Sequence, residues 1–245
     1  MTELGELRRI AIVPAWNEGA TVAGVVAELR AFDPGMVVVV VDDGSEDDTA
    51  AVAASAGAVV LRLPFNLGIG GAVQTGFRYA HEHGYDVAVR IDGDGQHDAA
   101  WLEAVLAPVL RGEADVAVGS RFLAAGGYRS SRSRRAGIRI LARVVSRLAG
   151  RRVTDPTSGF QALNRRGIEL FARDYPHDYP EVEATVIVAR NRLRSVEVPV
   201  AMRERGGGRS SITALSSIYY MVKVLLALFV GLFRAVDHFH EEAGA

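Results

Sequence analysis

The stretch Arg90–Asp98 reads R-I-D-G-D-G-Q-H-D and decides how the rest of the chain is interpreted. It overlaps Asp86–Ile91, where alternating apolar residues predict a buried strand. Side chains two residues apart on an extended chain point to the same side, so Asp92 and Asp94 can converge. Two carboxylates this close repel each other unless a cation lies between them, and hard oxygen ligands suit Mg²⁺ or Mn²⁺. The turn therefore predicts a metal site that also binds substrate phosphates; the alternative is an acidic turn that caps the next helix.

Composition narrows the class of protein. A chain of 245 residues can bury a full core, as one large domain or one domain with an appendage. The net charge of −1 gives the whole molecule no nucleic-acid signature, and the absence of cysteine excludes disulfides, a thiolate nucleophile and a cysteine-based zinc site. Residues 1–9 lack the apolar core of a signal peptide, which predicts a protein that stays in the cytosol.

Strands and helices alternate along the first half of the chain. The uninterrupted apolar run Met36–Val41 is typical of a parallel strand buried on both faces. This alternation predicts an α/β fold with right-handed crossovers and a ligand site at the carboxyl ends of the strands. Polar residues follow five successive expected strands: Asn17 and Glu18, Asp42 and Asp43, Asn66 and Gly70, Asp92 and Asp94, and Ser120 and Arg121. Because they share one edge of the sheet, we expect them to form one site.

A glycine-rich stretch, Gly68–Gly76, opens the helix after the third expected strand. Glycines at a helix start can cradle a phosphate, as in dinucleotide-binding folds. This stretch follows the third strand and lacks the G-x-G-x-x-G spacing, which argues against a dehydrogenase. Close helix packing or approach to a nucleotide is the favoured interpretation.

An arginine-rich segment lies between residues 129 and 152. A four-residue spacing predicts a helix over 135–149 with one basic stripe and one apolar stripe. Three interpretations stay open: a solvated basic face, a helix at an anionic membrane surface, and, ranked lowest because no aromatic interleaves, a nucleic-acid surface. The stripes comprise Arg135, Arg139, Arg143 and Arg147, and Ile138, Leu141, Val145 and Leu148.

Two charged segments flank the last expected strand, an acidic helix start before it and a basic loop after it. Glu181 and Glu183 open a helix expected over 180–194, where acids complement the helix dipole. A last strand is expected over 196–200. The glycine-rich loop 203–211 carries the donors needed to bind phosphate.

The segment 212–233 is almost wholly apolar, and its last 19 residues approach the length that spans a bilayer. Lys223 and a thin polar stripe favour a helix that lies in the membrane interface or docks on a partner, with spanning and packing on its own domain as alternatives. We therefore expect a catalytic domain over 1–211, a membrane-interface or partner-docking helix over 212–236 and a flexible tail over 237–245.

Six short motifs between residues 13 and 160 occur in the order seen in family 2 glycosyltransferases. Within that family the chain most resembles the dolichyl- or polyprenyl-phosphate sugar synthases. The resemblance covers about residues 8–211 and implies a GT-A fold, a mostly parallel sheet flanked by helices. It implies inverting transfer from a nucleotide sugar (GDP-mannose or a UDP-hexose) to a polyprenyl phosphate, with Mg²⁺ or Mn²⁺, at the inner face of the plasma membrane. The alternative is a soluble family 2 enzyme that acts on a sugar hydroxyl. The motifs are Val13–Glu18, Val41–Ser45, Asn66–Gly68, Asp92–His97, Gly119–Arg121 and Asp155–Phe160.

The resemblance also implies roles for individual residues. Asp92, Asp94, Arg121 and Arg205 are the expected catalytic residues. The nucleotide sugar would be held by Pro14, Ala15, Asn17, Glu18, Asp42, Asp43, Asn66, Gly70, Asp92 and Gly93. The metal would be held by Asp92, Asp94 and Gln96, and the acceptor phosphate by Arg121, Arg135, Ser158, Arg205 and Ser210.

One departure concerns the membrane. Members of the family with a built-in membrane domain carry several spanning helices at the carboxyl end, whereas this chain has one ambiguous helix. The departure suggests a separate small membrane-protein subunit, and it leaves the mode of membrane attachment open.

The type of acceptor has a chemical consequence. A hydroxyl needs a general base, whereas a lipid phosphate is already an anion and needs only positioning. Beyond residue 120 arginines outnumber candidate bases, so we predict that neither Glu181 nor Glu183 is an obligatory base. The arginines considered are Arg121, Arg134, Arg135, Arg203, Arg205 and Arg209.

Overall fold

The computed structural model describes residues 7–123 and 132–203, together with Lys223, Val224, Leu226, Leu228 and Phe229. The side chains of residues 132–136 are not among those described. The expected roles of Arg205 and Ser210, the side chain of Arg135, most of the 212–236 helix and the 237–245 tail therefore lie outside the described residues.

A seven-stranded sheet forms the centre of the described part of the chain, in the order β3-β2-β1-β4-β6-β5-β7. Strands β1 to β4 pair in parallel, as do β5 and β7, while β6 runs antiparallel between β4 and β5. The mostly parallel α/β sheet confirms the expected fold class. The strands are β1 (Arg9–Ala15), β2 (Val37–Asp42), β3 (Val59–Arg62), β4 (Val87–Arg90), β5 (Val116–Ser120), β6 (Gln161–Asn164) and β7 (Ser195–Pro199).

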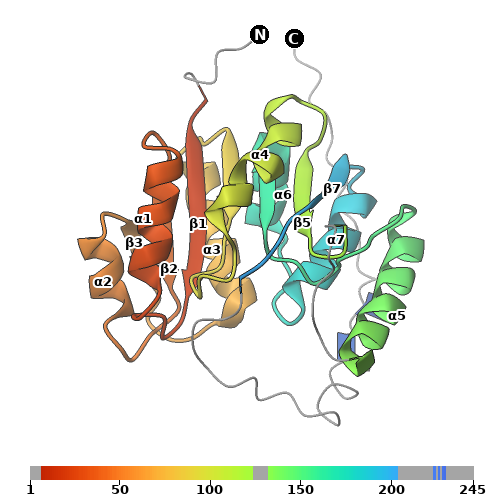
Figure 1. Ribbon diagram of the computed structural model, residues 1–245, viewed down its shortest axis with the longest axis horizontal. Helices are drawn as coiled ribbons and strands as arrows, with labels where there is room; N and C mark the ends of the chain where they lie inside the picture. Colours follow the sequence, from red (N-terminus) through yellow and green to blue (C-terminus); the bar gives the residue numbers. More distant parts are fainter. Residues whose placement is uncertain (1–6, 124–131, 204–222, 225, 227, 230–245) are drawn as a thin grey trace.

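Helices cover both faces of the sheet (Figure 1). One core lies between the sheet and α1 (Val22–Phe32), α2 (Thr49–Ser55) and α4 (Leu102–Leu110), which a short 3-10 turn (Ala99–Trp101) precedes. The other lies between the sheet and α3 (Gly68–Glu82), α6 (Arg165–Arg173) and α7 (Pro180–Arg190). Burial on both faces explains why β2 reads V-V-V-V-V-D rather than alternating.

Helix α5 (Arg132–Ala149) lies at the side of the sheet and packs on α7 (Figure 1). Leu141 and Val145 of its apolar stripe are buried there, with Val224 and Leu228 from the carboxyl segment in the same cluster. The basic stripe at Arg139, Arg143 and Arg147 is exposed. The two predicted stripes are thus confirmed at the positions whose side chains are described, and the apolar one packs within the chain. In the described part of the molecule, no helix is both long and apolar enough to cross a bilayer.

Several elements differ from what the sequence predicts. The loop after β1 continues to Thr21, with Asn17 at φ 55°, and α1 begins only at Val22. Helix α7 ends at Arg190, since Arg192 takes φ 56°, a left-handed conformation that cannot continue a right-handed helix. The strand β6 and the helix α6 were not expected as separate elements.

Candidate active site

The loops after β1 and β2 are joined at the carboxyl edge of the sheet. The backbone N–H of Asn17 donates to Ser45 Oγ at 2.9 Å, and Asn17 Oδ1 accepts from the N–H of Glu46 at 2.9 Å. The N–H of Glu18 donates to Thr49 Oγ1 at 2.9 Å. Asn17 and Glu18 therefore lie where the sequence placed them, and these contacts hold the two loops in register.

Asp43 connects the loops after β2 and β3. Its Oδ1 accepts from the N–H of Leu67 at 2.7 Å, and its own N–H donates to the carbonyl of Ala15 at 2.9 Å. Burial raises the pKa of the Asp43 carboxyl, and the backbone hydrogen bonds offset this only in part. Asn66 lies in the same loop, where its Oδ1 accepts from the N–H of Gly68.

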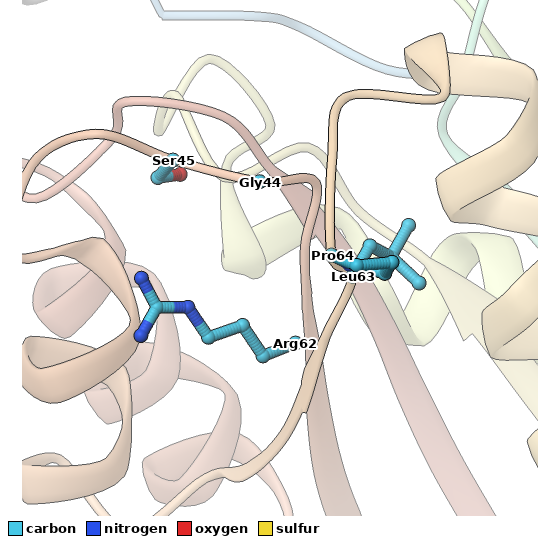
Figure 2. A pocket seen from close by; sticks show the side chains of 5 residues that line it. All are labelled: Gly44, Ser45, Arg62, Leu63 and Pro64. Carbon is cyan, nitrogen blue, oxygen red and sulfur yellow. The ribbon is translucent and has the colours of Figure 1, made fainter.

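A hollow of about 350 Å³ opens between the same two loops (Figure 2). Its lining is Gly44, Ser45, Arg62, Leu63 and Pro64. The side chain of Arg62 extends below Ser45, while Leu63 points the other way (Figure 2).

Asp42 lies beside this hollow but is fully buried. Its Oδ1 accepts from the N–H of Ser45 at 3.1 Å, and Oδ2 lies 3.4 Å from Arg62 Nε. Asp42 thus shapes the turn, and its expected contact with the donor stays a prediction.

The D-G-D turn packs directly on the end of β1. The N–H of Gly93 donates to the carbonyl of Pro14 at 3.3 Å, and Thr21 Oγ1 donates to the carbonyl of Gly93 at 2.8 Å. A Cβ at residue 93 would lie 3.1 Å from the Pro14 oxygen and 3.2 Å from Ala15 Cβ, so a larger residue would fit only if these neighbours shifted slightly. Pro14, Ala15 and Gly93 therefore meet, as the shared sheet edge predicts.

Asp94 is 9% exposed, and its Oδ1 accepts from the N–H of Gln96 at 3.0 Å. The Asp92 side chain is 34% exposed. Within the described residues, no group of three acids, histidines or cysteines is arranged to hold a metal. Mg²⁺ is commonly bound by one or two protein carboxylates and completed by substrate phosphates and water. The carboxylates of Asp92 and Asp94, two residues apart on one turn, fit that pattern.

His97 packs against the D-G-D turn and stabilises it by a hydrogen bond. Its Nδ1 accepts from the N–H of Asp92 at 3.0 Å, and its ring stacks on Phe160 at 5.0 Å between centroids. Burial lowers the pKa of the imidazole, which favours the neutral ring that this hydrogen bond requires. The remaining proton then resides on Nε2, 3.7 Å from Asp92 Oδ2. His97 was not predicted as a site residue, although it stands in the same motif.

Arg90, at the end of β4, was also missed. Its guanidinium is 1% exposed and donates to Tyr175 Oη at 2.9 Å and to Glu181 Oε1 at 2.7 Å. A longer contact of 3.4 Å reaches Asp92 Oδ1. Burial by itself lowers the pKa of Arg90, but Tyr175, Glu181 and Asp92 outweigh this and raise it, so the charge is retained. The signal in the sequence is an arginine among buried strand residues.

Arg121 lies at the carboxyl end of β5 and faces the loop 154–157. It donates to both carboxylate oxygens of Asp155 at 2.7 Å and to Thr157 Oγ1 at 2.7 Å. Glu197 accepts from the N–H groups of Thr154 and Asp155, which fixes the loop. Arg121 thus occupies the expected edge, and its contact with an acceptor stays a prediction.

Ser158, expected to bind the acceptor phosphate, is 1% exposed. Its Oγ accepts from the N–H of Phe160 at 3.4 Å. The structure therefore shows a turn-forming contact for this side chain, and its proposed role toward an acceptor stays a prediction.

The segment after β7 crosses the sheet to the loop after β4 (Figure 1). The N–H of Arg203 donates to the carbonyl of Gln96 at 2.9 Å, which places the start of the basic loop beside the D-G-D turn. The Arg203 side chain donates to Glu28 at 2.7 Å and to Asp98 at 2.8 Å. Arg203 therefore anchors this crossing, rather than adding to the arginines available for a phosphate.

The glycines of α3 serve close packing. A Cβ at Gly70 would lie 2.3 Å from the carbonyl of Pro176, and one at Gly76 would lie 2.3 Å from Ile12 Cγ2. This confirms the packing interpretation at both positions. The expected contribution of Gly70 to a donor site stays a prediction.

The model of the family described as "Glycosyl transferase family 2" matches residues 10–171. The chain is 31% identical over 138 residues to a UDP-N-acetylglucosamine–dolichyl-phosphate N-acetylglucosaminyltransferase of Methanococcus voltae, a match that covers 55% of each chain. It is 35% identical over 150 residues to an undecaprenyl-phosphate mannosyltransferase of Micrococcus luteus, covering 60% of this chain and 61% of the relative. The chain thus spans 55% and 61% of the length of these two relatives.

The fold is similar to that of glucosyl-3-phosphoglycerate synthase from Mycobacterium tuberculosis, solved in complex with Mn²⁺, UDP-glucose and phosphoglyceric acid. The TM-score is 0.69 at 22% sequence identity, and the match covers 95% of this chain and 82% of that one. This likeness shows the GT-A-like fold.

Proposed function

Because the chain belongs to glycosyltransferase family 2, we propose that it transfers a sugar from a nucleotide sugar to a polyprenyl phosphate, with inversion at the anomeric carbon. The observation that carries the proposal is the convergence of the D-G-D turn, the Asp43 loop and Arg121 at one edge of the sheet. The names of two relatives, which act on dolichyl phosphate and undecaprenyl phosphate, support this choice of acceptor.

In the proposed mechanism, the loops after β1, β2 and β3 bind the nucleoside, and Asp43 is the buried carboxylate that faces it. Asp92, Asp94 and Gln96 would hold a divalent cation. Bound Mg²⁺ or Mn²⁺ supplies Lewis-acid stabilisation of the charge that develops on the leaving diphosphate. Pro14, Ala15 and Gly93 fix the turn close to β1 and so keep the two acids in place.

The group transfer needs no proton transfer from the acceptor. A phosphate oxygen of the acceptor forms a bond to the anomeric carbon as the bond from that carbon to the diphosphate oxygen breaks. The electron pair leaves with the nucleoside diphosphate. Arg121 and Arg205 would orient the acceptor, because arginine binds phosphate by paired hydrogen bonds.

The contacts of Glu181 give an indirect argument that the acceptor is an anion. It is the acid from α7 that lies next to the turn, but it accepts a 2.7 Å hydrogen bond from the buried guanidinium of Arg90. Glu181 Oε1 already accepts from Arg90, so it would have to give up this hydrogen bond before it could accept a proton from a substrate hydroxyl. This argues against a hydroxyl acceptor activated by Glu181.

The proposed setting is the cytoplasmic face of the membrane. The exposed stripe of Arg139, Arg143 and Arg147 supports association with an anionic surface, where each basic residue contributes about 1 kcal/mol. We further propose that residues 1–211 form the catalytic domain, that 212–236 attaches to the membrane or to a small membrane subunit, and that 237–245 is a tail.

A donor and acceptor screen tests the function. Radiolabelled GDP-mannose, UDP-glucose and UDP-N-acetylglucosamine are incubated with the protein, Mn²⁺ and either undecaprenyl phosphate or free glycans. Label should pass into an organic-extractable lipid from one donor, and the D94A variant should not produce it. Transfer of label to glycans and not to the lipid would instead support the alternative, a soluble enzyme acting on a sugar hydroxyl.

A further inference from the structure

Arg90 is a charged side chain in the interior of the molecule, and it is among the largest of the fully buried side chains. It ends β4, two residues before Asp92. Removing a guanidinium from water is costly, and replacing a buried ion pair by apolar residues is often neutral or even stabilising. Stability alone therefore does not explain an arginine at this position.

The contacts of Arg90 reach two acids of different elements. Nη2 donates to Glu181 Oε1 of α7 at 2.7 Å and approaches Asp92 Oδ1 of the D-G-D turn at 3.4 Å. Nη1 donates to Tyr175 Oη at 2.9 Å, and Nε has no hydrogen-bond partner in the described part of the chain. The guanidinium is therefore shared between two carboxylates, and the one from α7 is the closer.

Gly159 leaves the space in which this contact forms. A Cβ there would lie 2.9 Å from Arg90 Nη2 and 3.3 Å from Asp92 Oδ1. The backbone of the loop before β6 thus packs against both members of the pair. The position of Asp92 is set from this side as well as from His97.

We propose that Glu181 is a positioning residue that acts through Arg90: the two form a neutral, oriented pair that holds Asp92 and leaves its charge available to a divalent cation. This inference rests on the proposed role of Asp92 in metal binding. With Glu181 ionised, the charges of Arg90 and Glu181 cancel. Without it, the whole positive charge of Arg90 faces Asp92 and opposes a cation on the other side, in an interior where such charges interact strongly.

The test uses E181Q, which keeps an oxygen to accept from Arg90 Nη2 but removes the charge. Mn²⁺ is titrated into the full-length protein, alone and with UDP or GDP, and free Mn²⁺ is followed by its EPR signal. We expect the dissociation constant for Mn²⁺ to rise on the order of ten- to a hundredfold, the usual effect of losing a residue that orients a metal ligand. Turnover of E181Q at saturating Mn²⁺ should remain close to that of the wild type.

E183Q is the matched control, because Glu183 lies in the same first turn of α7 and carries the same charge. It should leave Mn²⁺ binding unchanged. The double variant R90M/E181Q removes both charges and leaves no unbalanced guanidinium, so it should bind Mn²⁺ more tightly than E181Q. A merely structural loss would not be reversed by a second substitution in the core.

The inference is overturned if E181Q binds Mn²⁺ as the wild type does, or if R90M/E181Q binds it no better than E181Q. It is also overturned if E181Q loses turnover at saturating Mn²⁺ together with the acidic limb of its pH profile, because that pattern identifies a general base. The EPR titration requires neither sugar nor acceptor. It therefore tests the role of Glu181 even if the proposed sugar transfer is not observed.

Discussion

Arg121 donates to both carboxylate oxygens of Asp155 at 2.7 Å, and the Asp155 side chain has no exposed surface. The arginine expected to meet the acceptor is therefore also the cationic partner of a buried acid. This dual position determines which substitution gives an informative result.

The change R121A should lower the free energy of unfolding by about 3–5 kcal/mol, because it leaves Asp155 buried without a counter-charge. R121K keeps a positive charge beside Asp155 but loses the paired N–H donors of the guanidinium. It should raise the acceptor KM about tenfold while the protein stays folded. Urea denaturation and acceptor kinetics measure the two effects. An R121K enzyme with the wild-type acceptor KM would contradict a role in acceptor binding.

The change D94A should lower turnover by orders of magnitude with a much smaller effect on thermal unfolding, because Asp94 is proposed to hold the metal and its hydrogen bond from the N–H of Gln96 is local to the turn. Removing divalent cations with EDTA should abolish wild-type activity, and Mn²⁺ should restore it. Melting curves recorded beside the kinetics provide the control. Wild-type turnover of D94A in saturating Mn²⁺ would show that Asp94 is not a metal ligand.

Two helical glycines form a matched pair for testing the packing of α3. G24A in α1 adds a Cβ with nothing within 4 Å and should stabilise the protein by about 0.5–1 kcal/mol. G70A places a Cβ 2.3 Å from the Pro176 carbonyl and should destabilise it by about 1–3 kcal/mol. Chemical denaturation compares them. Equal stabilisation by both would mean that the loop at Pro176 yields without cost.

The basic stripe of α5 predicts salt-sensitive binding to anionic vesicles. Replacing Arg139, Arg143 and Arg147 by glutamine should weaken sedimentation with vesicles that contain phosphatidylglycerol, because each arginine contributes about 1 kcal/mol at such a surface. The control replaces three exposed arginines of α6, each of which pairs with an acid: Arg165, Arg166 and Arg173. If both triple variants lose binding equally, the attraction depends on net charge and not on α5.

The lowered pKa of Asp115 predicts that the stability of the protein depends on pH. Burial by itself raises the pKa of this carboxyl, but hydrogen bonds from Arg194 and Asn164 outweigh it and lower the pKa below 3.8. The unfolded chain therefore takes up a proton before the folded protein does. The stabilising contribution is present above about pH 3.8 and declines as the pH falls toward the folded pKa. The stability difference between wild type and D115N should be larger at about pH 6 than at about pH 3. A difference independent of pH would exclude this linkage.

The strands β1 to β5 could be predicted from sequence because each is a short apolar run followed by polar residues. Gln161–Asn164 offers no such run, and its place between β4 and β5 depends on pairing with Val87–Arg90, far away in the sequence. Local periodicity carries no information about such a pairing.

The residues of the candidate site also divide into those that the local sequence predicts and those that depend on contacts far away in the sequence. Asp43 and Asp92 were found because chain direction alone brings the carboxyl ends of parallel strands to one edge. Arg90 was missed because Tyr175 and Glu181 reach it from a different part of the chain. Arg121 was expected to be available to an acceptor, and only the structure shows that Asp155 also engages it.

The antiparallel strand β6 also determines when the sheet is completed during synthesis. Residues 9–90 contain four neighbouring strands, so they can pair as soon as they leave the ribosome, whereas β5 waits for β6 and β7. Until residues 161–164 emerge, β4 is an open edge of a half-sheet. Open edges recruit strands from other chains, and a charged residue on the edge strand discourages such pairing. Arg90 stands on that edge, so it would protect the nascent protein from aggregation before it is enclosed.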